Sequence, residues 1–102
     1  YPNPRALGEW HNNKGLLFRK QKNNVEAIQS WEKAIEAFSE IDDKFGKSDT
    51  YFYLGELYYD TNNFNQALLN INKSLQLGTE LNVLEYEIEE LKVLFNCEPT
   101  LT

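Results

Sequence analysis

Apolar residues recur along this chain at the 3.6-residue spacing of amphipathic helices, in five segments separated by short polar turns. The clearest stripe belongs to the second segment: Ala27, Ile28, Trp31, Ala34, Ile35, Phe38 and Ile41. The first segment carries Leu7, Trp10 or His11, Leu17 and Phe18, the third Tyr51, Leu54, Gly55 and Tyr58, the fourth Ala67, Leu68, Ile71, Leu75 and Leu77, and the fifth Leu84, Ile88, Leu91 and Phe95. The pattern predicts an all-α protein.

Capping residues and breaks suggest where these helices begin and end. Asn3 before Pro4 is typical of a first helix that runs to about 20. Asn23 with Glu26, and Asn63 with Gln66, have the spacing of capping boxes that begin the second and fourth helices. The second helix is expected to reach about 44, before a break at 45–47 and a cap at Ser48 begin the third. A fifth helix is expected over about 83–97.

A shift of 40 residues superposes the two halves of the chain without a gap. It places small residues, caps and apolar residues in one register: Gly15 on Gly55, Phe18 on Tyr58, Asn23 on Asn63, Ala27 on Ala67, Lys33 on Lys73 and Ile35 on Leu75. Because these residue types serve different purposes in a helical hairpin, their joint match indicates a tandem repeat. Gly55 and Ala67 are then expected where the two helices of the second hairpin pack closely.

The repeated pattern resembles the tetratricopeptide repeat family. The residues that carry the resemblance are Tyr51, Leu54, Gly55, Tyr58, Phe64, Ala67 and Leu68 in one unit, and Gly15, Phe18, Ala27, Trp31 and Ala34 in the other. The first unit departs from the family at Lys14 and Trp10, which suits a terminal repeat. The 40-residue period exceeds the usual ~34, and is similar to the longer variant of kinesin light chains, Pins-type polarity adaptors and bacterial response-regulator-binding proteins.

This resemblance implies an all-α helical-repeat solenoid with two helix-turn-helix repeats and a C-terminal capping helix. The expected organisation is a single domain over 1–102: repeat one at about 8–47, repeat two at about 48–82, the capping helix at about 83–97 and a tail at 98–102. The function implied is that of a non-catalytic scaffold or adaptor, which binds a peptide or helix of a partner protein in a concave groove.

In such a solenoid the first helix of each pair lines the groove. The residues expected to bind a partner there are Asn12, Leu16, Arg19, Phe52, Glu56 and Tyr59, with Glu9 and Asp49 beside them. Aromatic residues and arginine are frequent interface anchors. The alternative for Phe52 and Tyr59 is that they pack on a neighbouring helix, the fifth in particular.

Charge narrows the class of partner. The net charge is −6, and all of it lies in residues 52–102, because 1–51 carry eight basic and eight acidic side chains. An acidic half disfavours nucleic acid and anionic membranes and favours a basic peptide or protein, although a merely solubilising surface is the alternative. The carboxylate clamp that many family members use for chaperone C-termini needs Lys, Asn and Arg where this chain has Asn12, Leu16, Tyr53 and an acidic fifth segment. We therefore expect no binding of chaperone tails.

Candidate catalytic and metal-binding residues are few. His11 is the only histidine and Cys97 the only cysteine, so a disulfide and a cysteine-based zinc site are excluded within the chain. Asp42-Asp43 lacks the spacing of a calcium loop, and no phosphate-binding loop is present. We expect no enzymatic activity, no cofactor and no metal. The single cysteine fits a reducing compartment, so a cytoplasmic location is favoured.

Two alternatives to peptide binding remain at this point. One is a structural or self-associating segment, in which the repeat surface forms a homodimer or docks within a longer chain. Val83, Val93 and Leu94 of the fifth segment are a further candidate surface for self-association. The other is the regulatory or sensor portion of a larger bacterial signalling protein, which fits the long repeat and the absence of Met, because that absence suggests an excised domain or a processed product. The sequence does not identify the partner.

Overall fold

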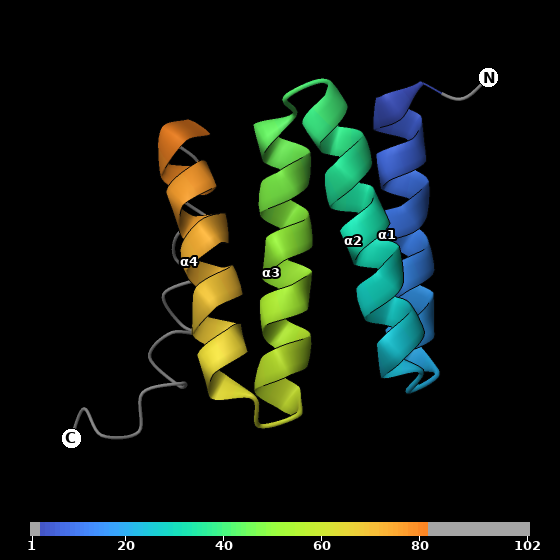
Figure 1. Cartoon of the computed structure of the whole chain (residues 1–102), viewed down its shortest axis with the longest axis vertical. Helices are drawn as coiled ribbons and strands as arrows, with labels where there is room; N and C mark the ends of the chain where they lie inside the picture. The colour runs from blue at the N-terminus through green and yellow to red at the C-terminus, as the bar shows by residue number, and fades with distance from the viewer. Residues whose placement is uncertain (1–2, 82–102) are drawn as a thin grey trace.

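The structure is a computed structural model that describes residues 3–81. Over this range the chain forms four helices of nearly equal length and no strand: α1 (Pro4–Lys20), α2 (Asn24–Glu40), α3 (Lys44–Asp60) and α4 (Phe64–Leu81). They lie in chain order as two antiparallel hairpins side by side, with α1 and α4 at opposite ends of the row (Figure 1). The all-α helical-repeat fold is confirmed. The predicted helix over 83–97 lies outside the described residues.

The three turns between the helices share one backbone conformation. Lys22, Asp42 and Asn62, spaced 20 residues apart, have φ values of 63°, 49° and 64°. The amide of the residue after each of them donates to a carbonyl five residues back, at 2.8–2.9 Å, which satisfies a terminal carbonyl of the preceding helix as in a Schellman motif. Because each turn is equally short, the helix length and the turn together fix a 20-residue half-period and hence the 40-residue repeat.

Several predicted helix ends are wrong. Helix α2 ends at Glu40, and α3 begins at Lys44 with the Asp43 carboxylate accepting from the Gly46 amide at 3.0 Å, so Ser48 is not a cap. Gly46 lies inside α3. Only glycine fits there, because a Cβ would be 2.5 Å from the ring of Phe38. The glycine therefore serves helix packing and does not end a helix, while Asp42 takes the left-handed position that glycine often occupies.

The capping box predicted at the start of α2 is also wrong, since the Asn23 side chain makes no capping hydrogen bond. The side-chain nitrogen of Asn23 instead lies 3.5 Å from the side-chain oxygen of Gln21. The predicted cap at the start of α1 is confirmed, because the Asn3 side chain accepts from the Ala6 amide at 2.7 Å.

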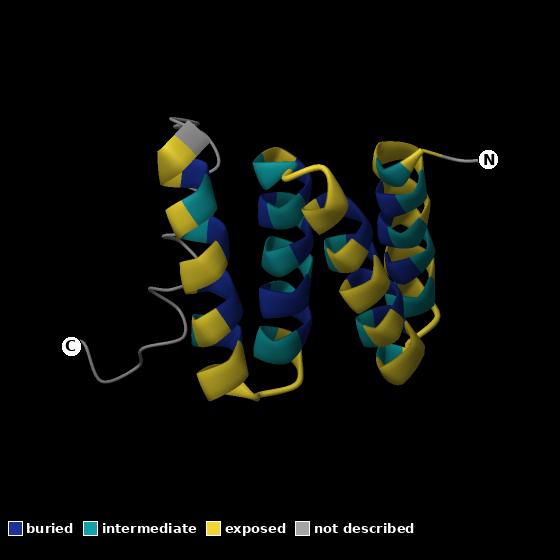
Figure 2. Ribbon diagram, turned by 45° about the horizontal axis from the view of Figure 1, so that its top comes forward, coloured by how far each residue is buried: buried dark blue, intermediate teal, exposed yellow. Residues whose placement is uncertain are grey.

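The core lies between the helices of each hairpin and between α2 and α3. Its fully or almost fully buried apolar residues are Ala27, Trp31, Ala34, Ala37, Phe38, Leu54, Leu57, Ala67 and Ile71. Figure 2 shows buried residues as dark blue bands on every helix, with exposed residues in yellow on the outer sides and in the turns. Helix α3 contacts the other three helices, which explains why its polar and apolar residues are less cleanly separated than those of α2.

Glycine allows the closest helix contacts. A Cβ at Gly15 would lie 2.3 Å from the indole nitrogen of Trp31, and one at Gly55 would lie 2.4 Å from Ile71 Cδ1. Gly55 also approaches the Ala67 carbonyl oxygen, with 3.4 Å between that oxygen and such a Cβ, so the expected close packing of Gly55 and Ala67 is confirmed.

The apolar face expected on α1 is only partly correct. Trp10 and Leu17 are 56% and 54% exposed, whereas His11 is half-buried, so His11 and not Trp10 is in the core register. The buried residues of α1 are Gly8, Asn12 and Gly15. Ile41, expected to extend the α2 stripe, is exposed because α2 ends one residue before it.

Candidate interaction surface on α1 and α3

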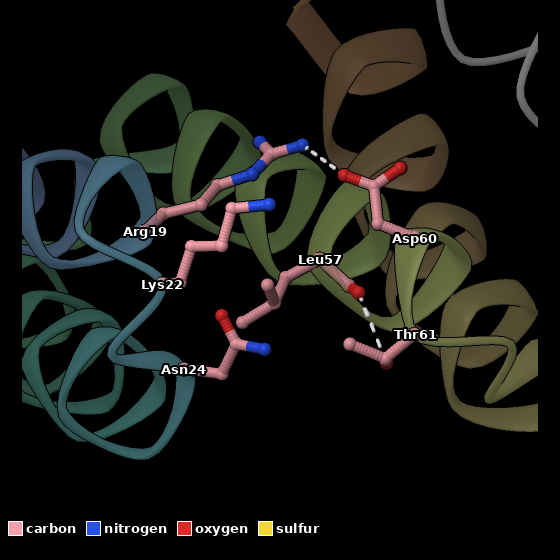
Figure 3. Close-up of a pocket in the computed structure, with 6 residues that line it drawn as sticks. All are labelled: Arg19, Lys22, Asn24, Leu57, Asp60 and Thr61. Carbon is pink, nitrogen blue, oxygen red and sulfur yellow. Dashed lines mark hydrogen bonds and ion pairs between the residues drawn. The ribbon is translucent and has the colours of Figure 1, made fainter.

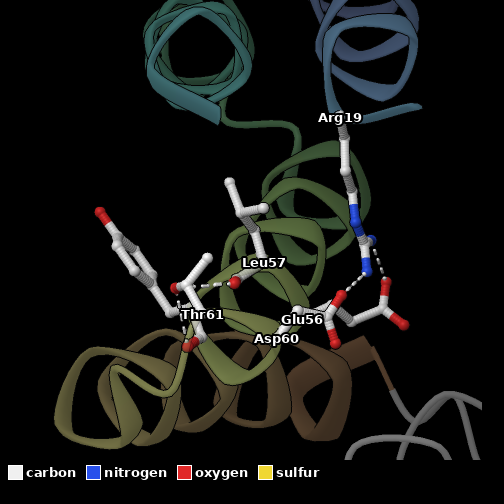
Figure 4. Close-up of polar contacts among 6 residues, drawn as sticks. Arg19, Glu56, Leu57, Asp60 and Thr61 are labelled. Carbon is white, nitrogen blue, oxygen red and sulfur yellow. Dashed lines mark hydrogen bonds and ion pairs between the residues drawn. The ribbon is translucent and has the colours of Figure 1, made fainter. Parts of the chain in front are cut away.

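An ionic cluster joins the two repeats on the surface formed by α1 and α3, hereafter the α1–α3 face. The Arg19 guanidinium donates to Glu56 at 3.2 Å and to Asp60 at 2.6 Å (Figure 4). Arg19 comes from the end of α1 and the two acids from the last turns of α3, so the contact spans both hairpins. Burial lowers the pKa of Arg19, but the hydrogen bonds and charges of Asp60 and Glu56 outweigh it and raise that pKa overall. Arg19 therefore remains a cation held by two carboxylates.

Asn12, predicted to face a partner, lies largely inside the molecule. It is 8% exposed, and its side-chain oxygen is 2.7 Å from the hydroxyl of the fully buried Thr50. Its backbone carbonyl accepts from the Trp31 indole at 3.2 Å. Asn12 thus connects α1 to both α2 and α3, and this fixes the spacing of the helices that carry the other predicted residues.

The apolar residues predicted for this face are partly accessible. Leu16 is 36% exposed, and Phe52 and Tyr59 are half-buried. The Tyr59 ring packs on Phe64 at the start of α4, with 5.7 Å between ring centroids. Intramolecular packing therefore accounts for part of the Tyr59 surface and leaves the rest for contact with another molecule.

Tyr53 is a member of this region that sequence reasoning did not include among the binding residues. Its ring lies 5.8 Å from that of Trp31, and burial, followed by the charges of Asp49 and Glu56, raises the pKa of its hydroxyl. Its place in the sequence, one residue after Phe52, could have indicated that it belongs to this region, because α3 contacts the other three helices. Tyr53 links the α1–α3 face to the core and stays neutral at physiological pH.

A cavity of about 210 Å³ lies beside the ionic cluster, between the α1–α2 turn and the end of α3. It is lined by Arg19, Lys22, Asn24, Leu57, Asp60 and Thr61 (Figure 3). The Thr61 hydroxyl is occupied, since it donates to the Leu57 carbonyl at 3.1 Å. The cavity therefore adds a polar recess at one end of the α1–α3 face.

Neither a metal centre nor a membrane span is found in the part of the chain that the structure describes. Residues 3–81 contain no group of three or more His, Cys, Asp or Glu side chains placed to hold a metal ion. None of the helices within this range is both long and apolar enough to cross a bilayer.

Two helical hairpins related by 40 residues, with small residues at their crossing points, define a helical-repeat protein of the interaction-module class. A family model described as "Tetratricopeptide repeat" matches residues 7–80, so the chain belongs to the tetratricopeptide repeat family. Comparisons with curated proteins and with solved structures gave no significant match. Domains of this family typically bind protein partners and are generally non-catalytic.

Proposed function

We propose that this domain binds a basic peptide or helix of a partner protein on the α1–α3 face. The observation that carries the proposal is the state of Arg19, because a guanidinium is already bound there by Glu56 and Asp60 at hydrogen-bonding distance. Each carboxylate contacts Arg19 through one oxygen, and two acids against one base leave the cluster with a net negative charge that an arginine or lysine of a partner would balance.

The charge of the face supports a basic partner. Of the eight residues that the repeat register assigns to it, Glu9, Asp49 and Glu56 are acidic and Arg19 is the only base. A surface with an excess of one charge increases the association rate with an oppositely charged partner and disfavours like-charged partners. Nucleic acid and anionic membranes are disfavoured for the same reason.

The apolar residues of the face supply anchoring contacts. The half-buried Phe52 and Tyr59 on α3 are aromatic residues of the kind enriched at interfaces, and tyrosine is among those that often carry most binding energy. Leu16 on α1, 36% exposed, adds apolar area beside them. The spacing of Phe52 and Tyr59, about two helical turns on α3, fits a partner segment that lies along this helix.

Selection of peptides from a random display library against the whole chain tests the proposal. We expect the selected peptides to be enriched in arginine and lysine. In fluorescence anisotropy, Glu56→Gln with Asp60→Asn should weaken the best peptide about fivefold or more, which corresponds to ~1 kcal/mol for a partly exposed ionic contact.

The matched control is Glu26→Gln with Glu40→Gln, which removes the same charge from exposed positions of α2. Phe52→Ala with Tyr59→Ala tests the apolar contacts. Peptides without basic enrichment, or equal effects of the α3 and α2 charge variants, would exclude the α1–α3 face as a site for basic partners.

Self-association is a second candidate, favoured by one observation on α1. Trp10 and Leu17 are 56% and 54% exposed, yet they are in register with Thr50 and Leu57, which are 0% and 3% exposed in the second repeat. A second copy could cover this exposed stripe. Sedimentation velocity should then show a dimer that Trp10→Ser with Leu17→Ser dissociates, while the exposed Val25→Ser leaves it intact. A monomer at every accessible concentration would eliminate this candidate.

A further inference from the structure

A second cavity, of about 280 Å³, lies where α2, α3 and α4 meet. The residues that line it are mostly hydrogen-bond donors: Ser39, Lys47, Tyr51, Lys73, Gln76, Leu77 and Glu80. No residue of α1 takes part, so the cavity is separate from the α1–α3 face.

Helix geometry places this cavity on the opposite side of α3 from the proposed peptide site. At about 100° per residue, Lys47 is about 140° from Phe52 and about 180° from Glu56 around the helix axis. Tyr51 follows Lys47 by one turn and lies on the same side. A ligand in this cavity would therefore leave the α1–α3 face free.

Two lysines give the cavity its character. The Lys47 side chain lines the cavity and is only 20% exposed. Its ion pair with Asp42 is long, at 3.6 Å, and Asp42 is 75% exposed. The Lys73 ammonium lies 5.3 Å from the centre of the Tyr51 ring. Such long or solvent-exposed contacts are weak and easily exchanged.

The one carboxylate that lines the cavity is already engaged. Glu80 pairs with Lys44 at 3.2 Å. The hydroxyls of Ser39 and Tyr51 and the Gln76 amide add donors to the two ammonium groups. Together these groups form a recess rich in donors and cations on a chain whose net charge is −6.

We propose that this cavity binds an oxyanion, a phosphate monoester or a carboxylate, between Lys47 and Lys73. Its volume, about 280 Å³, lies just below the roughly 300–1,000 Å³ of typical small-ligand sites, which leaves room for an anionic group together with the side chain that carries it. The ammonium groups supply charge-assisted hydrogen bonds, and the neighbouring hydroxyls and amide complete the oxygen contacts. The domain would then hold an acidic group on one side and a basic segment on the other.

The repeat supplies an internal comparison. Lys73 is in register with Lys33, but Lys47 and Tyr51 are in register with Leu7 and His11. The first repeat therefore has one of the two lysines without the second, and Lys33→Gln is a control with the same charge change as Lys73→Gln alone.

The test is an NMR titration of the whole chain, with backbone amide shifts followed at constant ionic strength. The probes are inorganic phosphate, a neutral peptide with one phosphoserine and the same peptide with glutamate in its place, with sodium chloride as the reference. We expect saturable shifts around Tyr51, Lys73 and Gln76 with phosphate and not with chloride.

Lys47→Gln with Lys73→Gln should weaken binding about tenfold or more, while Lys33→Gln should leave it unchanged. Lys73→Gln alone, at an exposed position that does not threaten folding, should weaken it by a smaller factor. Tighter binding of either peptide than of free phosphate would identify a partner's side chain as the ligand, and the reverse would identify a free anion. Shifts that fail to saturate with all three probes, or that survive in the double variant, would overturn the proposal.

Discussion

Replacing Gly15 with alanine is expected to destabilise the protein by about 2 kcal/mol, although alanine is the better helix former. Helix propensity alone favours the change by ~1 kcal/mol. Against this, the new Cβ would lie 2.3 Å from the indole nitrogen of Trp31 and 2.5 Å from its Cδ1, and Trp31 is fully buried. Forcing the ring aside costs ~1–3 kcal/mol by overpacking, and losing the 3.2 Å hydrogen bond from the indole to the Asn12 carbonyl costs about 1 more.

The second repeat provides the comparison. Gly55 occupies the same register, and a Cβ there would meet Ile71 Cδ1 at 2.4 Å and Cγ1 at 2.6 Å. These atoms belong to the end of a flexible chain that can change rotamer, whereas the Trp31 ring is rigid and held by a hydrogen bond. Gly55→Ala should therefore cost less than Gly15→Ala, by about 1 kcal/mol or more.

Thermal unfolding followed by far-UV circular dichroism measures both effects. A loss of 2 kcal/mol should lower the Tm of a chain of this size by roughly 10 °C, while Asn13→Ala, at an exposed position of α1, should raise it slightly. In a double-mutant cycle, Trp31→Ile should relieve much of the Gly15→Ala penalty, because it places in repeat one the residue that repeat two has. A Gly15→Ala protein as stable as the wild type would refute the argument that the ring contact requires glycine.

Three further predictions concern polar groups. Thr50→Val should cost about 1–3 kcal/mol in denaturant unfolding, because it leaves the buried Asn12 oxygen without its 2.7 Å partner; the exposed Thr79→Val should be nearly neutral, and equal effects would contradict this. Burial, and then the charges of two nearby lysines, lower the pKa of His11 below 6.5. The unfolded chain therefore takes up the proton first, and the stability that neutral His11 contributes is complete above pH ~6.5 and lost as the pH falls below it. The Tm of the His11→Gln variant should accordingly fall less than that of the wild type when the pH is lowered from ~7.5 to ~5.5. An identical fall in both proteins would exclude His11 as the cause of the pH dependence. Arg19→Gln should cost ~0.5–1 kcal/mol at low salt, and the cost should shrink in concentrated salt; a cost independent of salt would show that packing, not charge, dominates.

Helical periodicity and the 40-residue match were sufficient to predict an all-α tandem repeat, and the resemblance to the tetratricopeptide repeat family implied its arrangement as a solenoid. Trp31, Ala34 and Phe38 recur on one side of any helix that contains them, whatever its neighbours, so α2 and its buried face could be predicted from local pattern alone. The ends of the helices were harder to predict. Gly46 resembled a break because glycine is a poor helix former, and only the position of the Phe38 ring shows why glycine is required inside α3.

The predicted binding residues show a similar division. The register correctly placed Arg19 and Glu56 on adjoining helices, but the sequence could not show that they bind each other, since side chains 37 residues apart meet only after the hairpins pack. Asn12 was expected at the surface because the repeat register places it on the groove side of the first helix. It is buried because Thr50 of the next repeat supplies its hydrogen bond.

The sequence by itself determined the elements of this protein: helices from the apolar period, turns from their polar residues, and a tandem repeat from the match of Gly15 with Gly55 and Ala27 with Ala67. These features depend on neighbours within a few residues or on comparison of the chain with itself. The tertiary structure decided which polar residues are inside, which charges are neutralised, and that Lys47 and Lys73 line one cavity. Those outcomes depend on the distances between helices, which the packing of Trp31, Phe38 and Ile71 against glycines sets and no local pattern encodes.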